Sequence, residues 1–169
     1  NQIYGLTKGQ ASPTSQKGIK TKAQPGGVIL ERFNPVAIAV AMRAGFVARS
    51  FTGAVDHLAR VIRLGIAHRG FAVIDVLQPC VSFNRVNTFA WYKKRCVELA
   101  ADYDPTDWAS AMKTAMEWED RIPIGVIYRN DRPPFESLIS VLSTGPLVGR
   151  EPDPAALDAE MNRIGGVGR

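Results

Sequence analysis

The chain has 169 residues, 46% of them hydrophobic, a length that suits one globular domain burying roughly two-thirds of its unfolded surface. No apolar run reaches the ~18 residues of a membrane span and no secretory signal is present, so the chain's own signals indicate neither a membrane protein nor a secreted one. The net charge of +5 is spread along the chain without a basic block, which argues against a nucleic-acid-binding arm.

Strands and helices alternate along the middle of the sequence. Asn34 takes an N-cap position before Pro35, and a short buried helix is expected over 34–45. A longer helix is expected within 51–70, where apolar residues recur at helical spacing before Gly70. Two more helices are expected over 87–100 and 107–118, and strands over 46–50, 71–79 and 122–130. The strand over 71–79 is almost continuously apolar, which is typical of a strand covered on both faces. This order predicts an α/β fold with a doubly wound, mostly parallel sheet, in which ligands bind beyond the carboxyl ends of the strands.

The two ends depart from this alternation. The first 30 residues or so are rich in Gly, Pro, Ser, Thr and Lys and predict a long loop of the kind that usually serves a site. The C-terminal stretch holds two weak helices, "FESLISVLS" and "DPAALDAEMNRI", and its last residues are expected to be disordered. The expected division is therefore a domain over 1–136 and a tail over 137–169.

The opening "NQIYGLTKGQ" contains an amide side chain, two glycines, a threonine and a lysine. Such a loop suits a diphosphate and a hard cation, because Mg²⁺ is usually held by one or two protein oxygens together with substrate phosphates. By residue type alone, an ordinary surface loop is the favoured explanation of the same pattern.

A longer set of motifs resolves this choice. The segments "NQIYGLTKGQASPTS", "TKAQPGG", "NPVAIAVAMRAGFVARSF", "GIAHRGFAVIDVLQPCVSFN" and "RIPIGVIYRNDRPPFE" resemble the beta subunit of the 2-oxoacid:ferredoxin oxidoreductases, from Asn1 to about Glu136. The resemblance implies a thiamine diphosphate-binding fold of the pyrophosphate-domain type. Members of that family carry cysteine motifs and a Gly-Asp-Gly stretch upstream of the matching region, and none of these is in this sequence. The resemblance therefore covers the C-terminal part of such a subunit, with its N-terminal part missing.

The resemblance also assigns roles to residues of the opening loop. Asn1, through its side chain, and Ile3, through its backbone carbonyl, match the Mg²⁺ ligands that neutralise the cofactor diphosphate. The cofactor-binding residues implied are Asn1, Ile3, Tyr4, Gly5, Leu6 and Thr7. Leu6 is expected to pack near the reacting carbon of the thiazolium ring, and Lys8 to meet a substrate carboxylate, so these two residues are the expected catalytic pair. An exposed lysine without a role is the alternative for Lys8.

Cys80 matches a thiolate ligand of a 4Fe-4S cluster in the family. It follows the expected strand 71–79, at the edge of the sheet where ligands bind. Such a cluster takes four cysteines, whereas this chain has two, and Cys96 is expected to be a small core residue on a helix with Phe89, Tyr92 and Leu99. So few cysteines fit a reducing compartment, and a cytoplasmic location is expected.

Several other residues have weaker expectations. Within the family reading, Ser12, Pro13, Thr14, Thr21 and Lys22 are expected to help close the site, while Phe83 and Asn84 follow Cys80 and would shield the cluster. His57 and His68 are expected to be structural, because neither has a second ligand or carboxylate at suitable spacing. Asp75 is expected to be a hydrogen-bonded structural carboxylate, since burying it unpaired would be costly.

Three functions fit these patterns. The first is part of a 2-oxoacid:ferredoxin oxidoreductase beta subunit, which uses thiamine diphosphate, Mg²⁺ and a 4Fe-4S cluster to convert 2-oxoglutarate or pyruvate to an acyl-coenzyme A and reduce ferredoxin. Its expected partners are an alpha subunit, ferredoxin, the 2-oxoacid and coenzyme A. The second is a catalytically incomplete fragment or split subunit serving as an interaction half. The third is a small basic binding domain of unrelated role.

Overall fold

The computed structural model of the chain describes residues 2–165 and divides into two compact units. The first unit extends to Pro134 and the second begins at Phe135. The first unit contains a four-stranded sheet with helices on both faces, so the expected α/β class is confirmed.

The sheet has the strand order β2-β1-β4-β3. Its strands are β1 (Phe46–Phe51), β2 (Ala72–Leu77), β3 (Cys96–Glu98) and β4 (Ile122–Arg129). The β1–β2 and β3–β4 pairs are parallel, whereas β4 runs antiparallel to β1. The sheet is therefore mostly parallel with one antiparallel step at its centre, and β2 lies at an edge of the described sheet.

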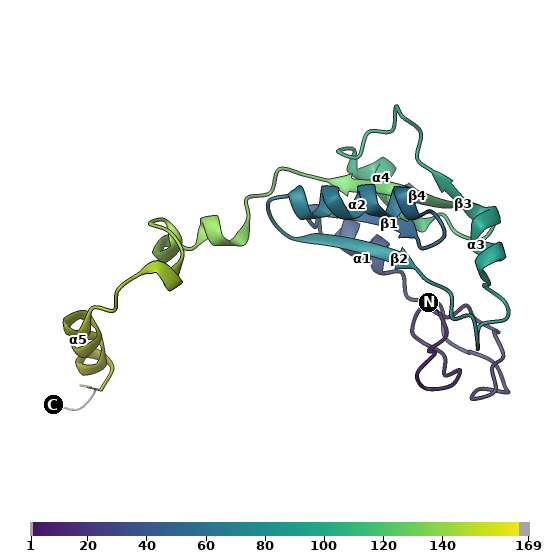
Figure 1. Ribbon diagram of the computed structural model, residues 1–169, viewed down its shortest axis with the longest axis horizontal. Coiled ribbons are helices and arrows are strands. Elements are labelled where there is room, and N and C mark those ends of the chain that lie inside the picture. Colours follow the sequence, from purple (N-terminus) through teal and green to yellow (C-terminus); the bar gives the residue numbers. More distant parts are fainter. Residues whose placement is uncertain (1, 166–169) are drawn as a thin grey trace. The chain divides into compact units, whose positions relative to one another are not determined.

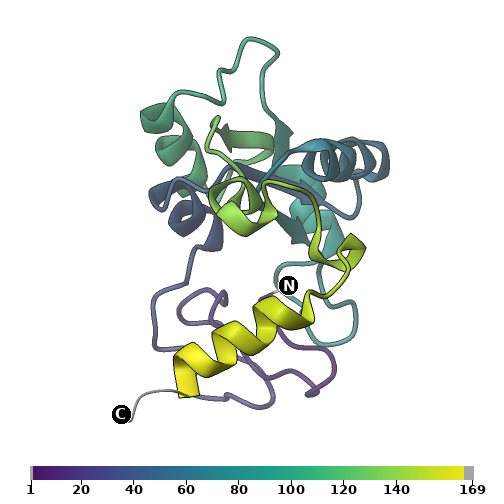
Figure 2. The same cartoon turned by 90° about the vertical axis from the view of Figure 1, so that its left-hand side faces the viewer.

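Helices pack on both faces of this sheet (Figures 1 and 2). Helix α2 (Val55–Ala67) lies on one face, where Val61 packs with Phe46 and Ala48 of β1. Helices α1 (Pro35–Ala41) and α4 (Trp108–Met116) lie on the other face in a shared cluster with residues of β1 and β4. This is the doubly wound arrangement, and it leaves the ends of the strands open for a site.

Hydrogen bonds hold the short helix α1 at both of its ends. The Asn34 side chain accepts a hydrogen bond from Ala37 N–H at 3.1 Å, which confirms the expected N-cap. Its amide nitrogen donates to the carbonyl of Ala115, at 3.0 Å, near the end of α4. The indole nitrogen of Trp108 donates to the carbonyl of Val40, at 2.9 Å. One polar side chain from each helix therefore ties α1 to α4.

A separate cluster lies at the carboxyl ends of β1 and β2. It contains Phe51 and Leu77, the last residues of those strands, together with Ile122 at the start of β4 and Tyr92 of α3 (Phe89–Arg95). Tyr92 is fully buried there. This cluster matters for the site because the N-terminal loop attaches to it.

The expected helix over 87–100 is wrong in its second half. Helix α3 ends at Arg95, and Cys96 to Glu98 form β3, which pairs with Ile122 to Ile124 of β4. The helical spacing of Phe89, Tyr92 and Leu99 continues past this point, so local pattern alone favours a longer helix. Pairing with β4 satisfies the backbone groups of these residues instead, which is a contact between distant segments.

The second unit is mainly short helical turns. The helix expected over "FESLISVLS" is wrong, because that segment forms two 3-10 helices, η1 (Phe135–Leu138) and η2 (Ser140–Leu142), and a third, η3 (Leu147–Gly149), follows. The helix expected over 153–164 is confirmed as α5 (Pro154–Gly165). The expectation of disorder at the extreme end concerns residues 166–169, which lie outside the described residues. Within 2–165, no helix is both long and apolar enough to cross a bilayer.

Candidate functional site

The N-terminal segment up to residue 33 is the long loop expected from its composition. Its first part folds back on itself through an antiparallel bridge between Ile3 and Ala11. Tyr4 N–H donates to Gln10 C=O at 2.8 Å, and Ser12 N–H donates to Gln2 C=O at 3.0 Å, on either side of this bridge. We call residues 2–12 the cofactor loop, because it contains the described residues that the family resemblance assigns to the cofactor.

Gln2 anchors the cofactor loop to the sheet domain. Its side chain is 2% exposed, and its amide nitrogen donates to the Tyr92 hydroxyl at 3.3 Å. Its backbone carbonyl accepts hydrogen bonds from the hydroxyls of Ser12 and Ser15. Nothing in the sequence pattern distinguishes Gln2 from a solvated loop residue, and only its distant partner Tyr92 reveals its role.

The tip of the cofactor loop is a tight turn. Lys8 N–H donates to Gly5 C=O and Gly9 N–H donates to Tyr4 C=O, both at 3.0 Å. Lys8 and Gly9 have positive φ angles of 60° and 101°, which the turn requires and which glycine adopts without strain. Leu6 is 98% exposed at this tip, and Thr7 and Lys8 are exposed beside it. The two expected catalytic side chains are therefore accessible, and Leu6 has no apolar neighbours covering it within the described chain.

The backbone groups of Ile3 make no hydrogen bond in the bridge to Ala11. In the bridge described above, the ladder bonds are made by the residues on either side of Ile3, so the N–H and C=O groups of Ile3 itself point away from Ala11. Its side chain is buried, at 1% exposed, which fixes the peptide in place. Asn1, the other expected Mg²⁺ ligand, lies outside the described residues.

Cys80 lies against the same loop. A Cβ atom placed on Gly5 would be 3.3 Å from the Sγ atom of Cys80, so the absence of a side chain at Gly5 allows this approach. Burial raises the pKa of the Cys80 thiol, but hydrogen bonds from the backbone N–H groups of Phe83, Ser82 and Asn84 outweigh it and bring the pKa below its usual value. The site therefore stabilises a thiolate, which is the form of cysteine that ligates metals.

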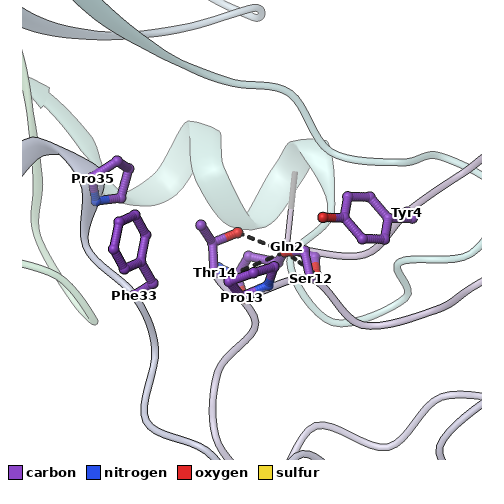
Figure 3. A pocket seen from close by; sticks show the side chains of 7 residues that line it. All are labelled: Gln2, Tyr4, Ser12, Pro13, Thr14, Phe33 and Pro35. Atoms are coloured by element: carbon purple, nitrogen blue, oxygen red, sulfur yellow. Dashed lines mark hydrogen bonds between the residues drawn. The ribbon is translucent and has the colours of Figure 1, made fainter.

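Two pockets beside the cofactor loop contain residues that the resemblance assigns to the site. The first is an apolar cavity of about 620 Å³ with Tyr4 towards one end and Phe33 and Pro35 towards the other. Between them lie Gln2, Ser12, Pro13 and Thr14 (Figure 3). The Ser12 and Thr14 hydroxyls are 2.8 Å apart and hydrogen-bonded, so these expected closing residues hold the wall of this cavity together.

The second pocket is basic and has a volume of about 390 Å³. It lies between the N-terminal loop and the segment after Cys80, and Ile3 and Gly9 belong to its wall. Its charged residues are Lys8, Lys20, Lys22 and Arg85. Ile3 and Tyr4 thus line different pockets, so the cofactor loop separates an apolar cavity from a basic one.

A buried ion pair links strands β1 and β2 of the sheet. Arg49 of β1 is 1% exposed and donates from its Nε to Asp75 of β2 at 3.1 Å. Burial lowers the pKa of Arg49, and Asp75 opposes that change. The guanidinium of Arg32 lies 3.7 Å from the centroid of the Trp118 ring, with Arg49 over the same ring at 5.4 Å. The expectation that Asp75 is a hydrogen-bonded structural carboxylate is confirmed, whereas the sequence patterns do not reveal its partner Arg49.

The two histidines and Cys96 occupy structural positions. His57 of α2 is 6% exposed, and its Nδ1 is hydrogen-bonded to the Ser50 hydroxyl at 2.8 Å. Burial lowers the pKa of His57. Cys96 packs against the cluster around Tyr92, and burial raises its pKa to about 11, so it is the inert small residue expected, although in a strand instead of a helix. His68 caps the end of α2 through its backbone, and its ring packs at a tilt against that of Phe46.

Metal-ligating side chains do not gather in the part of the chain that the structure describes. Across residues 2–165, no three His, Cys, Asp or Glu side chains gather as a metal site. Cys80 with its backbone donors fits one ligand position of an iron–sulfur cluster, and the carbonyl of Ile3, which makes no bond in the bridge to Ala11, is a donor of the type that a hard cation takes. The described residues therefore supply one candidate ligand for the cluster and one for the cation, and the remaining ligands would have to come from elsewhere.

Comparisons with known proteins agree with this geometry. Residues 1–76 match the family profile "Thiamine pyrophosphate enzyme, C-terminal TPP binding domain", and residues 80–144 match the profile of the C-terminal region of the pyruvate ferredoxin oxidoreductase beta chain. The beta subunit of a 2-oxoacid:ferredoxin oxidoreductase from Sulfolobus is 43% identical over 155 residues, covering 85% of this chain and 51% of the relative. The beta subunit of 2-oxoacid:ferredoxin oxidoreductase 1 from Aeropyrum pernix is 45% identical over 141 residues, covering 77% and 44%.

A solved structure extends the agreement to three dimensions. A 2-oxoglutarate:ferredoxin oxidoreductase from Magnetococcus marinus, determined with 2-oxoglutarate, coenzyme A and succinyl-CoA bound, superposes with a TM-score of 0.81 at 28% identity. The match covers all of this chain and 56% of that chain, so this chain spans about half the length of the relatives it matches. The second family profile and both curated relatives name the same kind of subunit. The chain belongs to the beta-subunit family of the 2-oxoacid:ferredoxin oxidoreductases and corresponds to the C-terminal part of those subunits.

Proposed function

We propose that this chain works as the C-terminal part of a beta subunit that oxidatively decarboxylates a 2-oxoacid, 2-oxoglutarate or pyruvate, and forms the acyl-coenzyme A. Electrons pass through a 4Fe-4S cluster to ferredoxin. The cofactors are thiamine diphosphate with Mg²⁺ and the cluster, and the partners are an alpha subunit and ferredoxin. The net charge of +5 favours encounter with an acidic electron carrier. The expected cytoplasmic location belongs to the same proposal.

The observation that carries this proposal is the contact between Gly5 and Cys80. The loop assigned to thiamine diphosphate and the cysteine assigned to the cluster come from segments about 75 residues apart in sequence, yet Cys80 Sγ is 3.3 Å from the position of a Cβ on Gly5. An oxidoreductase that would pass electrons from a thiamine diphosphate site to an iron–sulfur cluster needs the residues of both sites close together. A domain with an unrelated binding role has no need of this contact.

Thiamine diphosphate, when bound, supplies the nucleophilic carbon and the electron sink of the reaction. The chain's own residues position it. Asn1 and the carbonyl of Ile3 would hold Mg²⁺, and Tyr4, Gly5, Leu6 and Thr7 would contact the cofactor. The exposed Leu6 excludes water near the reacting carbon, where loss of CO₂ is favoured by a less aqueous environment. Lys8, also exposed on the turn, binds a carboxylate of the substrate.

Titration calorimetry with thiamine diphosphate and Mg²⁺ tests this assignment. The titration is made on the 169-residue chain alone and on the chain mixed with the N-terminal half of a related beta subunit. We expect tight binding in the mixture and weak binding by the chain alone, because the upstream Mg²⁺ ligand of the family lies outside this sequence. Absence of binding in the mixture, with both proteins folded by circular dichroism, would favour the alternative in which the chain is only an interaction half.

A further inference from the structure

Gln2 stands between Asn1 and Ile3, the two residues assigned to Mg²⁺. Its φ angle is 34°, in the left-handed region that residues other than glycine rarely adopt, so its backbone is strained. Such a conformation persists only where the surrounding contacts hold it. The contacts of Gln2 therefore hold the conformation from which the peptide of Ile3 extends.

Three donors converge on the backbone carbonyl of Gln2. They are the Ser12 N–H at 3.0 Å, the Ser12 hydroxyl at 2.9 Å and the hydroxyl of Ser15, which is itself 1% exposed. A carbonyl oxygen has two lone pairs, so three donors leave this group little freedom to turn. The same peptide unit includes the nitrogen of Ile3, and its orientation is therefore fixed.

The side chain of Gln2 is held at both atoms of its amide. The nitrogen donates to the Tyr92 hydroxyl at 3.3 Å, and the oxygen accepts from the Gln16 N–H, also at 3.3 Å. Gln16 is held in turn by Asn87, which is fully buried and donates from its amide nitrogen to the Gln16 side-chain oxygen at 3.1 Å. The position of Gln2 thus depends on residues about 90 positions away in the sequence.

The same network continues to the segment of Cys80. The Asn87 N–H donates to the side-chain oxygen of Asn84 at 2.8 Å, and the Asn84 N–H donates to the carbonyl of Cys80 at 3.1 Å. Asn84 and Asn87 are both buried. Buried and satisfied hydrogen bonds of this kind make a segment rigid, so Gln2 is attached to a fixed part of the domain.

We propose that Gln2 is a positioning residue for Mg²⁺, which sets the place of the Ile3 carbonyl so that it and the Asn1 side chain ligate the same cation. Mg²⁺ demands near-octahedral geometry at ~2.0–2.1 Å, so a small displacement of one oxygen weakens its binding. This role rests on the proposed function, because Mg²⁺ belongs to it. A residue that served only to attach the loop would be equally effective with an unstrained backbone.

Calorimetric titration with thiamine diphosphate over a series of Mg²⁺ concentrations tests this role, in the mixture of the full chain with the N-terminal half of a related beta subunit. Gln2→Met removes both side-chain hydrogen bonds at similar length, and Tyr92→Phe removes only the partner hydroxyl. The Mg²⁺ concentration for half-maximal binding is expected to rise at least about fivefold in each variant, because each loses a buried hydrogen bond. At saturating Mg²⁺, thiamine diphosphate affinity should return to within about twofold of the parent, which a general loss of folding would not allow.

Gln10→Met and Tyr103→Phe are the matched controls. Gln10 is an exposed residue of the same loop, and the Tyr103 hydroxyl donates to the carbonyl of Ile127 in β4 at 2.8 Å. Both should keep the Mg²⁺ requirement of the parent. An unchanged requirement in Gln2→Met and Tyr92→Phe, or an equal rise in the controls, would overturn the proposal, with folding of each variant checked by circular dichroism.

Amide hydrogen exchange on the full chain alone gives a readout that needs no cofactor. The N–H groups of Tyr4 and Ser12, which are bonded on either side of the Ile3–Ala11 bridge, should exchange at least about fivefold faster in Gln2→Met than in the parent or in Gln10→Met. Unchanged exchange would also overturn the positioning role.

The outcomes separate this role from the proposed function. Thiamine diphosphate binding by the parent mixture, with the same Mg²⁺ requirement in Gln2→Met, would remove the role of Gln2 and leave the proposed function standing. Absence of thiamine diphosphate binding in the parent mixture would remove the proposed function, and the role of Gln2 with it.

Discussion

Gly5 of the cofactor loop lies against the thiol of Cys80, with Cys80 Sγ 3.3 Å from the position that a Cβ atom on Gly5 would occupy. This spacing is closer than an ordinary contact between a methyl group and sulfur, so a side chain at Gly5 forces one of the two segments to move. Gly5 does not have a positive φ angle, so this position requires glycine for its small size and not for its backbone conformation. At this contact, a shift of the loop assigned to thiamine diphosphate would also shift Cys80, the residue assigned to the iron–sulfur cluster.

The Gly5→Ala variant tests this coupling. Its methyl group is expected to displace Cys80 by a few tenths of an ångström and to lower the iron and sulfide content of the assembled enzyme. Gly26→Ala is the control, because a Cβ atom at Gly26 meets nothing within 4 Å. Chemical analysis of iron and sulfide per chain measures the effect. Equal iron content in the two variants would contradict the coupling.

The Cys80→Ala variant separates the two cofactors. In the assembled enzyme it is expected to leave thiamine diphosphate affinity within about twofold of the parent, because Cys80 is not among the residues assigned to that cofactor and the smaller alanine does not press on Gly5. Ferredoxin reduction should fall by at least about a hundredfold, since the cluster loses one of four thiolate ligands. Cys96→Ala is the matched variant and should retain activity. Unchanged ferredoxin reduction in Cys80→Ala would remove the ligand assignment.

His57 predicts a pH dependence of stability. Burial lowers its pKa below the ordinary ~6.5, so the unfolded chain binds a proton more readily than the folded chain in acid. The contribution of neutral His57 is therefore complete above about pH 6.5 and is lost as the pH falls through the lowered pKa of the folded state. Urea unfolding at pH 7.5 and 5.5 should show a smaller loss of stability in His57→Gln than in the parent. An identical loss in both proteins would exclude His57 as the cause.

Substituting Asp75 and substituting Arg49 are expected to lower the free energy of unfolding by different amounts, although the two residues form one ion pair. Asp75→Asn leaves the guanidinium of Arg49 buried without a counter-charge, and the free energy of unfolding is expected to fall by about 3 kcal/mol. Arg49→Met removes the buried charge and leaves a carboxylate that is 23% exposed and can be solvated, so a smaller loss is expected.

Glu98→Gln is the control for this pair, since it breaks an ion pair with Arg60 whose two side chains are more than half exposed. Its effect on the free energy of unfolding should stay below about 1 kcal/mol. Urea unfolding curves measure all three variants. A loss in Asp75→Asn no larger than in Glu98→Gln would show that the buried pair contributes no more than a surface pair.

Local sequence determined most helices and strands of the first unit. Asn34 followed by Pro35, the apolar spacing of α2 and the β-branched runs of β2 and β4 are signals carried by neighbouring residues, and the structure follows them. The loop character of the N-terminal segment was equally readable from its glycines, prolines and small polar residues. The long, ordered motifs also pointed to the family that the comparisons then showed.

Tertiary structure decided what depends on contacts between distant segments. Cys96 to Glu98 form a strand because β4 supplies partners for their backbone groups, although the residues before them continue a helical pattern. Gln2 is an anchor because Tyr92 lies beside it, and Arg49 is tolerated in the core because Asp75 neutralises it from the next strand. The proximity of Gly5 to Cys80 and the grouping of Lys8, Lys20, Lys22 and Arg85 around one pocket also arise only in the folded chain. In each case the energy that places the residue comes from a partner many positions away, which spacing along the chain does not reveal.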